Sequence, residues 1–432
     1  MRILLVFFLI IDFSFAQELI EIKGLRTYSI KDEILPPIII YNDIDEVGIE
    51  DTSNDFIVIE FDVKSKLKPN LQIIFKLCDK NWNPVDNIFL TNFGKDRFYN
   101  LQYNVAPNGV KGYNYSFKQS FPDNRGQVTF PFSGKYKYLI TEFDNENKIY
   151  GEGYFIVVYQ KFQVTAFYSK EVIDDSLSDI MEFNRRDRVT VNVEIPNSYD
   201  VFRQNEVEIV QNQKFFFSSI LNFNKKSKYE YGRYLQQNVK QYIKRDLLPG
   251  NEYRQLDLTD FRKYPNDRLL TSFTGIDVTR KFNYGGYDFN GGKKYYSNYD
   301  IYNEYLDYRF ELTLPFPADG EVYVIGSFNN WEIDKKYKME RSGNYYSLVV
   351  NLKRGIYDYQ YVVVKETHSS TKNLHVDWIE LEGNSWNTKN VYYILVYYNV
   401  IKSLNFIFDS FVFVVPFFYV FCNFSSWSSG RE

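Results

Sequence analysis

Residues 308–314 read YRFELTL, a segment in which apolar and polar side chains alternate strictly. Successive side chains of a β-strand point to opposite faces of the sheet, so this spacing produces one apolar and one polar face. The apolar face would carry Tyr308, Phe310, Leu312 and Leu314, and the polar face would carry Arg309, Glu311 and Thr313.

Similar runs follow this segment along the chain. They are EVYVIGSF at 321–328, NYYSLVVNL at 344–352 and GIYDYQYVVV at 355–364, with glycine-containing turns between them. Period-two alternation over successive short runs is typical of antiparallel strands with one buried face. We therefore predict a C-terminal β-sandwich over residues 307–400, closed by a last strand, VYYILVYY, at 391–398.

The preceding part of the chain also consists of strand-like runs. Phe, Trp and Tyr make up 19% of the 432 residues, and such side chains suit half-buried pleated surfaces. We predict an N-terminal β-sandwich domain over 22–160 and a middle β-rich domain over 161–306. The fold class is thus all-β, with tandem immunoglobulin-like or early-set β-sandwich domains. The N-terminal runs are FIVIEFDV (56–63), LQIIFKLCD (71–79), YNYSFKQS (113–120), GKYKYLITEFD (134–144) and YGEGYFIVVYQ (150–160).

The two ends of the chain differ from this pattern. Residues 1–16 combine a basic Arg2, an apolar run over 3–11 and a small residue, Ala16, which predicts a secretory signal peptide. The alternative, an uncleaved anchor, meets the difficulty that this run is shorter than the roughly 20 residues that span a bilayer. Residues 401–432 form an atypical tail, apolar and then Ser-rich, for which a weak membrane helix and a frameshifted coding sequence are both open interpretations.

Composition and motifs argue against most kinds of chemistry. The net charge of −4 disfavours a nucleic-acid binder, which needs a basic surface, and two cysteines make no disulfide framework. His368 and His375 are the only histidines, too few for a multi-histidine metal site, and no nucleophile elbow accompanies them. The Gly-rich stretch 284–292 lacks both phosphate-binding patterns. We therefore predict a non-enzyme with no catalytic residues, metal or cofactor.

One aromatic motif, GSFNNW at 326–331, is a candidate binding element. Trp331 could stack on a sugar ring while Asn329 and Asn330 bond its hydroxyl groups. In the other interpretation, which the composition favours, Trp331 packs beneath the loop and the two asparagines supply turn geometry.

This motif and the runs after it resemble glycogen-binding modules of AMP-activated kinase β-subunits and of branching enzymes. The resemblance rests on G-x-F-N-x-W and on the later strand GIYDYQY, and it implies an early-set sandwich. A lysine of the family's sugar site falls at about Gln360 here. Its second tryptophan falls near 365–367, where there is none, and Trp378 and Trp386 come later. The carbohydrate site is therefore expected to be incomplete.

A second resemblance covers residues 22–400. FKLCDKNWNP (75–84), FPFSGKYKYLI (130–140), GNEYRQLDL (250–258) and EGNSWNTKNVYYILVYY (382–398) occur in an order similar to the type IX secretion system plug proteins of Bacteroidota. The resemblance implies a non-enzymatic periplasmic protein that docks on the outer-membrane translocon barrel and plugs its periplasmic opening in the absence of cargo. The alternative is an exported glucan-binding protein that uses Trp331.

Overall fold

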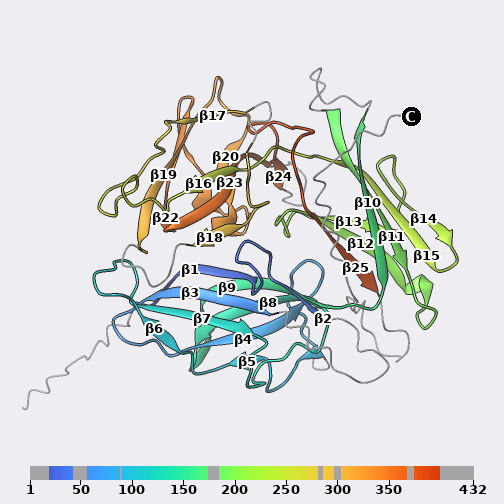
Figure 1. Cartoon of the computed structure of the whole chain (residues 1–432), viewed down its shortest axis with the longest axis horizontal. Coiled ribbons are helices and arrows are strands. Elements are labelled where there is room, and N and C mark those ends of the chain that lie inside the picture. The colour runs from blue at the N-terminus through green and yellow to red at the C-terminus, as the bar shows by residue number, and fades with distance from the viewer. Residues whose placement is uncertain are drawn as a thin grey trace, which may run out of the picture.

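Three β-sandwiches make up the described part of the chain in a computed structural model (Figure 1). The structure describes residues 19–41, 56–87, 90–173, 184–280, 286–295, 303–366 and 374–398. Within these ranges there is no α-helix, and accordingly no helix with the length and apolar character needed to cross a bilayer. The predicted all-β class is confirmed, while the predicted signal peptide at 1–16 and the tail at 401–432 lie outside the described residues.

The N-terminal sandwich packs a four-stranded sheet against a five-stranded one (Figure 1, blue to cyan). Its pairings are antiparallel except for β2 with β9, which is parallel. The first sheet has the order β1 (Glu21–Ser29), β3 (Ile57–Lys64), β7 (Tyr115–Phe121) and β6 (Tyr103–Val105). The second has the order β2 (Ile38–Tyr41), β9 (Asn145–Tyr159), β8 (Gly134–Glu142), β4 (Leu71–Cys78) and β5 (Arg97–Phe98).

The middle sandwich includes a strand that lies far away in the sequence. One sheet has the order β10 (Gln163–Val172), β11 (Arg185–Glu194), β15 (Val239–Leu247) and β14 (Glu230–Gln236). The other has the order β13 (Ser219–Asn222), β12 (Gln204–Gln211) and β25 (Tyr392–Tyr398), and the 3-10 turn η3 (Val201–Arg203) precedes β12.

Strand β25 therefore does not close the C-terminal sandwich, contrary to the expectation from the sequence. It pairs with β12 from Gln204↔Tyr398 to Gln211↔Tyr392. All seven of its residues are buried because each face packs against a different domain. Tyr392, Ile394, Val396 and Tyr398 enter the middle core, whereas Tyr393, Leu395 and Tyr397 pack against Ile38, Ile156 and Val158 of the N-terminal sandwich.

The C-terminal sandwich begins earlier than residue 307. Its first sheet centres on β23 (Gly355–Glu366), which pairs with β16 (Arg254–Asp257), β18 (Lys293–Tyr295), β20 (Glu321–Gly326) and β24 (Leu374–Asp377). The second has the order β17 (Asp277–Val278), β19 (Tyr305–Thr313), β22 (Tyr345–Lys353) and β21 (Glu340–Ser342). The predicted boundary at 306/307 thus separates β16–β18 from the sheets they complete, because these short strands lie in polar, turn-rich sequence.

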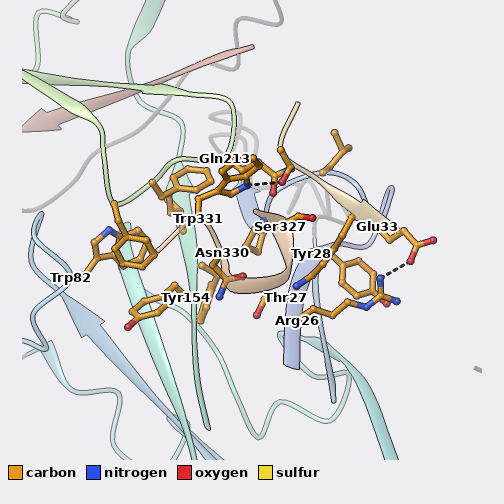
Figure 2. Close-up of a pocket in the computed structure, with 18 residues that line it drawn as sticks. Arg26, Thr27, Tyr28, Glu33, Trp82, Tyr154, Gln213, Ser327, Asn330 and Trp331 are labelled. Carbon is orange, nitrogen blue, oxygen red and sulfur yellow. Dashed lines mark hydrogen bonds and ion pairs between the residues drawn. The ribbon is translucent and has the colours of Figure 1, made fainter. Parts of the chain in front are cut away.

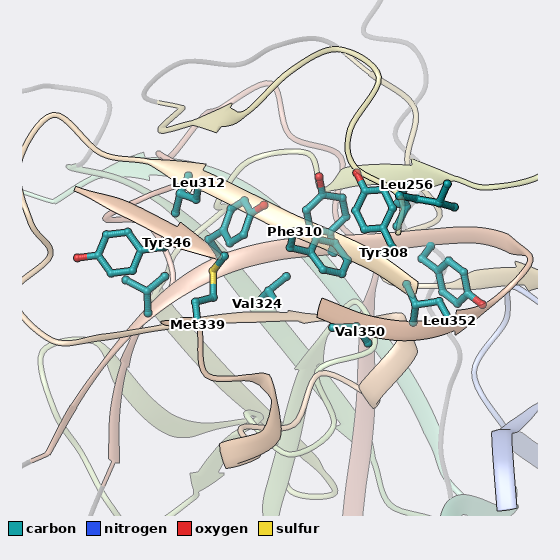
Figure 3. Close-up of a cluster of buried hydrophobic side chains, with 14 of the residues drawn as sticks. Leu256, Tyr308, Phe310, Leu312, Val324, Met339, Tyr346, Val350 and Leu352 are labelled. Atoms are coloured by element: carbon teal, nitrogen blue, oxygen red, sulfur yellow. The ribbon is translucent and has the colours of Figure 1, made fainter. Parts of the chain in front are cut away.

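The alternation in YRFELTL does build the core of this sandwich. Tyr308, Phe310 and Leu312 of β19 are buried between the two sheets, facing Val324 and Met339 (Figure 3). The 3-10 turns η4 (Ser327–Asn329) and η5 (Lys335–Tyr337) connect β20 to β21. The apolar face predicted from the sequence is thus the face that packs.

Buried ion pairs join the sandwiches. The Lys353 Nζ lies 2.6 Å from the Asp62 Oδ2, between the C-terminal and N-terminal sandwiches, and both side chains are 1% exposed. Lys135 of β8 and Glu208 of β12 make a second pair at 3.0 Å, with 3% and 0% exposure. Polar side chains on the outer faces of β3 and β8 are therefore buried because neighbouring domains cover them.

Candidate binding face of the C-terminal domain

The loop GSFNNW is held by its own asparagines. The Asn329 Oδ1 accepts from the Gly326 backbone N–H at 2.9 Å, and its Nδ2 donates to the Glu332 carbonyl at 2.9 Å. Asn330 is exposed and takes a left-handed conformation (φ 53°), which asparagine tolerates better than most residues. Asn329 thus supplies turn geometry, and its amide is already engaged within the loop.

Trp331 lies under this loop and is only 1% exposed. Its Nε1–H donates to the Gly291 carbonyl at 2.9 Å, and the ring centroid of Tyr253 lies 4.4 Å from its own. Gly291 has a φ of 93°, and a Cβ there would lie 3.1 Å from the Trp331 Nε1, so a glycine allows this close approach. Trp331 therefore presents no ring face to solvent, and the packing interpretation describes its position.

A second tryptophan, Trp378, lies beside Trp331 although it is 47 positions further along the chain. It follows β24 directly and packs partly buried on the same apolar cluster. The Gln360 side chain, on β23, donates to the Trp378 carbonyl at 3.4 Å. The fold therefore brings together Trp331, Gln360 and Trp378, which the sequence separation alone did not predict.

Residues of the middle domain cover the aromatic face of the C-terminal sandwich, which is formed by Trp331 and Trp378. Lys214, three residues after β12, places its Nζ 4.2 Å from the ring centroid of Trp378 and 5.9 Å from that of Trp331. Phe217 makes an edge contact with Trp378, with ring centroids 5.0 Å apart. These contacts leave a cavity of about 110 Å³ between the domains, lined by Lys214, Tyr253, Gln360 and Trp378 among others.

The Lys214 ammonium has aromatic rings rather than a carboxylate around it. Burial lowers the pKa of Lys214 to about 7, and Asp288 offsets this effect only in part. A cation over the face of an aromatic ring is attracted by the ring quadrupole, by roughly 0.5–2 kcal/mol depending on desolvation. Lys214 thus occupies the aromatic face at which a sugar would stack.

The remaining residues singled out in the sequence do not form a reaction centre. His375 is exposed on β24, and His368 lies outside the described residues. Cys78 is buried, and that burial raises the pKa of its thiol to about 12, which keeps it protonated and unreactive near neutral pH. In the part of the chain that the structure describes, no group of three or more His, Cys, Asp and Glu residues is arranged to hold a metal ion.

A family model matches most of the C-terminal sandwich. Residues 312–392 match the glycogen recognition site of AMP-activated protein kinase. The match begins within β19 and ends at the first residue of β25, so it omits β16–β18. The C-terminal sandwich is therefore similar to a glycogen-recognition domain, whereas no curated protein matches the chain.

Among solved structures, a hypothetical protein from Parabacteroides merdae shares the fold of nearly the whole chain. The TM-score is 0.67 at 21% identity, and the match covers 89% of this chain and 94% of that one. The full-length major pilin RrgB from Streptococcus pneumoniae covers 82% of this chain and 67% of its own at 9% identity, with a TM-score of 0.11 that is too low to indicate a common fold.

Proposed function

We propose that the protein is a non-enzymatic periplasmic component of the type IX secretion system. It docks on the outer-membrane translocon barrel and plugs the periplasmic opening of that barrel when no cargo passes. The sequence blocks at 75–84, 130–140, 250–258 and 382–398 support this proposal by their resemblance to the plug family. A hypothetical protein from Parabacteroides merdae shares the fold of nearly the whole chain.

The observation that carries the proposal is that the aromatic face is covered by other residues of the same chain. Lys214, Tyr253 and Phe217 cover Trp331 and Trp378, so this face of the C-terminal sandwich is occupied by packing contacts within the chain. Together with the buried pairs Lys353–Asp62 and Lys135–Glu208, this contact supports a single rigid body. A body that blocks a pore needs such rigidity, and it needs no reaction centre.

The test is reconstitution with the translocon. Purified barrel in a planar bilayer should conduct ions, and the chain added on the periplasmic side should reduce that conductance in a saturable way. The protein should also co-purify with the barrel from detergent-solubilised outer membranes, whereas an unrelated periplasmic protein should not. Unchanged conductance at saturating concentrations would reject the plugging role.

The competing function is glucan binding at Trp331. It would require the segment 214–217 and Tyr253 to leave the aromatic face, at the cost of the contacts described above. Sedimentation with insoluble starch or glycogen separates the two functions. We expect no retention of the wild-type protein, and saturable retention would favour glucan binding instead.

A further inference from the structure

A cavity of about 70 Å³ lies where the three sandwiches meet (Figure 2). The N-terminal sandwich contributes Arg26 and Trp82, the middle domain contributes Gln213, and the C-terminal sandwich contributes Lys293 and Asn330. A water molecule needs roughly 10–15 Å³ of such volume, so the space holds about five to seven water-sized groups. That volume fits a ligand of four or five non-hydrogen atoms.

Hydrogen-bond donors without acceptors line this cavity. Lys293 is only 8% exposed, and its ammonium makes no hydrogen bond or ion pair with the residues that the structure describes. The Arg26 Nε and the Trp82 Nε1 are buried and have no partner in the same set. A buried donor left unpaired is destabilising, more so when it is charged, so the cavity favours an occupant with acceptor atoms.

Lys293 and Arg26 lie at the same end of the cavity. Lys293 and Tyr295 are two residues apart on β18 and therefore share a face of that strand. The Arg26 guanidinium lies over the Tyr295 ring, 3.9 Å from its centroid. The Glu33 carboxylate accepts hydrogen bonds from the Arg26 Nη1 and from the Tyr295 backbone N–H. Figure 2 places Trp82 at the opposite end, beyond Asn330 and Tyr154.

The charges around this end do not cancel completely. Arg26 uses its two terminal nitrogens on Glu33 and Glu60, at 2.6 and 2.9 Å, and Lys118 lies 3.7 Å from Glu60. Three cations, counting Lys293, thus stand against two carboxylates. An ion with one negative charge would balance them, and charge-assisted hydrogen bonds of this type are stronger than neutral ones.

We propose that this cavity binds a small oxyanion, a carboxylate or phosphate ion, between the Lys293 ammonium and the Arg26 Nε. Gln213 and Asn330 line the same space, so the bound ion would contact residues of all three sandwiches and stabilise their packing. The site is independent of any role in secretion, because it needs only the chain itself. Water alone in the cavity is the alternative.

The experiment is calorimetric titration of the full-length protein with inorganic phosphate and, separately, with acetate. Burial lowers the pKa of Lys293 to about 7, so the titration is run at pH 6, where the ammonium carries its charge. The variants are K293M, which removes the charge at similar length, and K293R, which keeps it. The matched control is K294M, since Lys294 is the exposed neighbour on the same strand.

We expect saturable binding of at least one of the two ions to the wild type, with a matching rise in its thermal midpoint. K293M should weaken binding by about tenfold or more, whereas K293R and K294M should stay near wild type. Absence of saturable binding of either ion to the wild type would overturn the proposal, and this result does not depend on how any variant folds. Equal affinity of K293M and wild type would overturn it as well.

Discussion

The buried pair Asp62–Lys353 offers a quantitative test of how the N-terminal and C-terminal sandwiches are joined. The Asp62 Oδ2 accepts from the Lys353 Nζ at 2.6 Å and from the Tyr305 hydroxyl at 2.8 Å, while its Oδ1 has no partner in the described residues. Burial raises the pKa of Asp62 above its ordinary value of 3.8 despite the adjacent lysine. K353M would leave this carboxylate buried beside the Tyr305 hydroxyl alone.

The expected cost follows from two bounds. Removing one partner of a buried ion pair typically costs 3–5 kcal/mol. Asp62 can instead bind a proton, and with a reference pKa of 3.8 this costs about 4 kcal/mol at pH 7 and about 1.6 kcal/mol at pH 5, at roughly 1.36 kcal/mol per pH unit. The destabilisation by K353M should therefore be about 3–4 kcal/mol at pH 7 and at most about 1.6 kcal/mol at pH 5.

Urea unfolding followed by tryptophan fluorescence measures this difference at both pH values. The matched control is K365M, whose partner Asp319 lies at 3.1 Å but is 96% exposed, and which should cost less than about 1 kcal/mol. The double variant D62L/K353M should be close to the wild type or more stable, since it leaves no buried charge unpaired. A K353M cost below about 1 kcal/mol at pH 7, or a cost that does not fall at pH 5, would refute the reasoning.

Three further predictions concern the C-terminal domain and its contacts. W331A should lower stability by about 3–5 kcal/mol, because it empties a fully buried site; an unchanged thermal midpoint would contradict this burial. K214M should raise the urea midpoint most below pH 7 and have little effect near pH 10.5, since the folded pKa of Lys214 is about 7 against 10.5 unfolded; a pH-independent effect would contradict the assigned burial. Burial raises the pKa of Glu252 to about 7 from 4.5, so the stability that its protonated form contributes is fully present below pH 4.5 and is lost as the pH rises through 7. E252Q should therefore flatten the decline in the free energy of unfolding between pH 5 and 8. A decline parallel to that of the wild type would count against this assignment.

The sequence predicted the position of a strand well where one of its two faces is polar. YRFELTL alternates because only its apolar face is buried, and Tyr308, Phe310 and Leu312 lie in the core as expected. YYILVYY in β25 has no polar face, and a strand with two buried faces carries no information about which domain contains it. Its partner β12 could be found only from the folded structure.

The candidate site was predictable only in part. GSFNNW identified a glycogen-recognition type of loop, and the turn role of Asn329 followed from its residue type. Trp378 was missed as a neighbour of Trp331 because β24 runs back antiparallel along β23, with Asp377 opposite Val363, and sequence separation does not show this pairing. Lys214 carries no signal in the sequence, since a lysine on an aromatic face looks like any other surface lysine until another domain is packed against it.

Strand β25 makes the C-terminal sandwich an insertion within the middle one, since β16–β24 lie between β15 and β25 along the chain. The sheet formed by β13, β12 and β25 therefore cannot be completed until about 180 further residues have followed β12, and contacts across such distances are slow to form. Folding should proceed through the two outer sandwiches first and finish with the middle one. A chain interrupted before Tyr392 would expose the apolar faces of β12 and β9 together. These faces are therefore buried only in a chain that has been synthesised through β25.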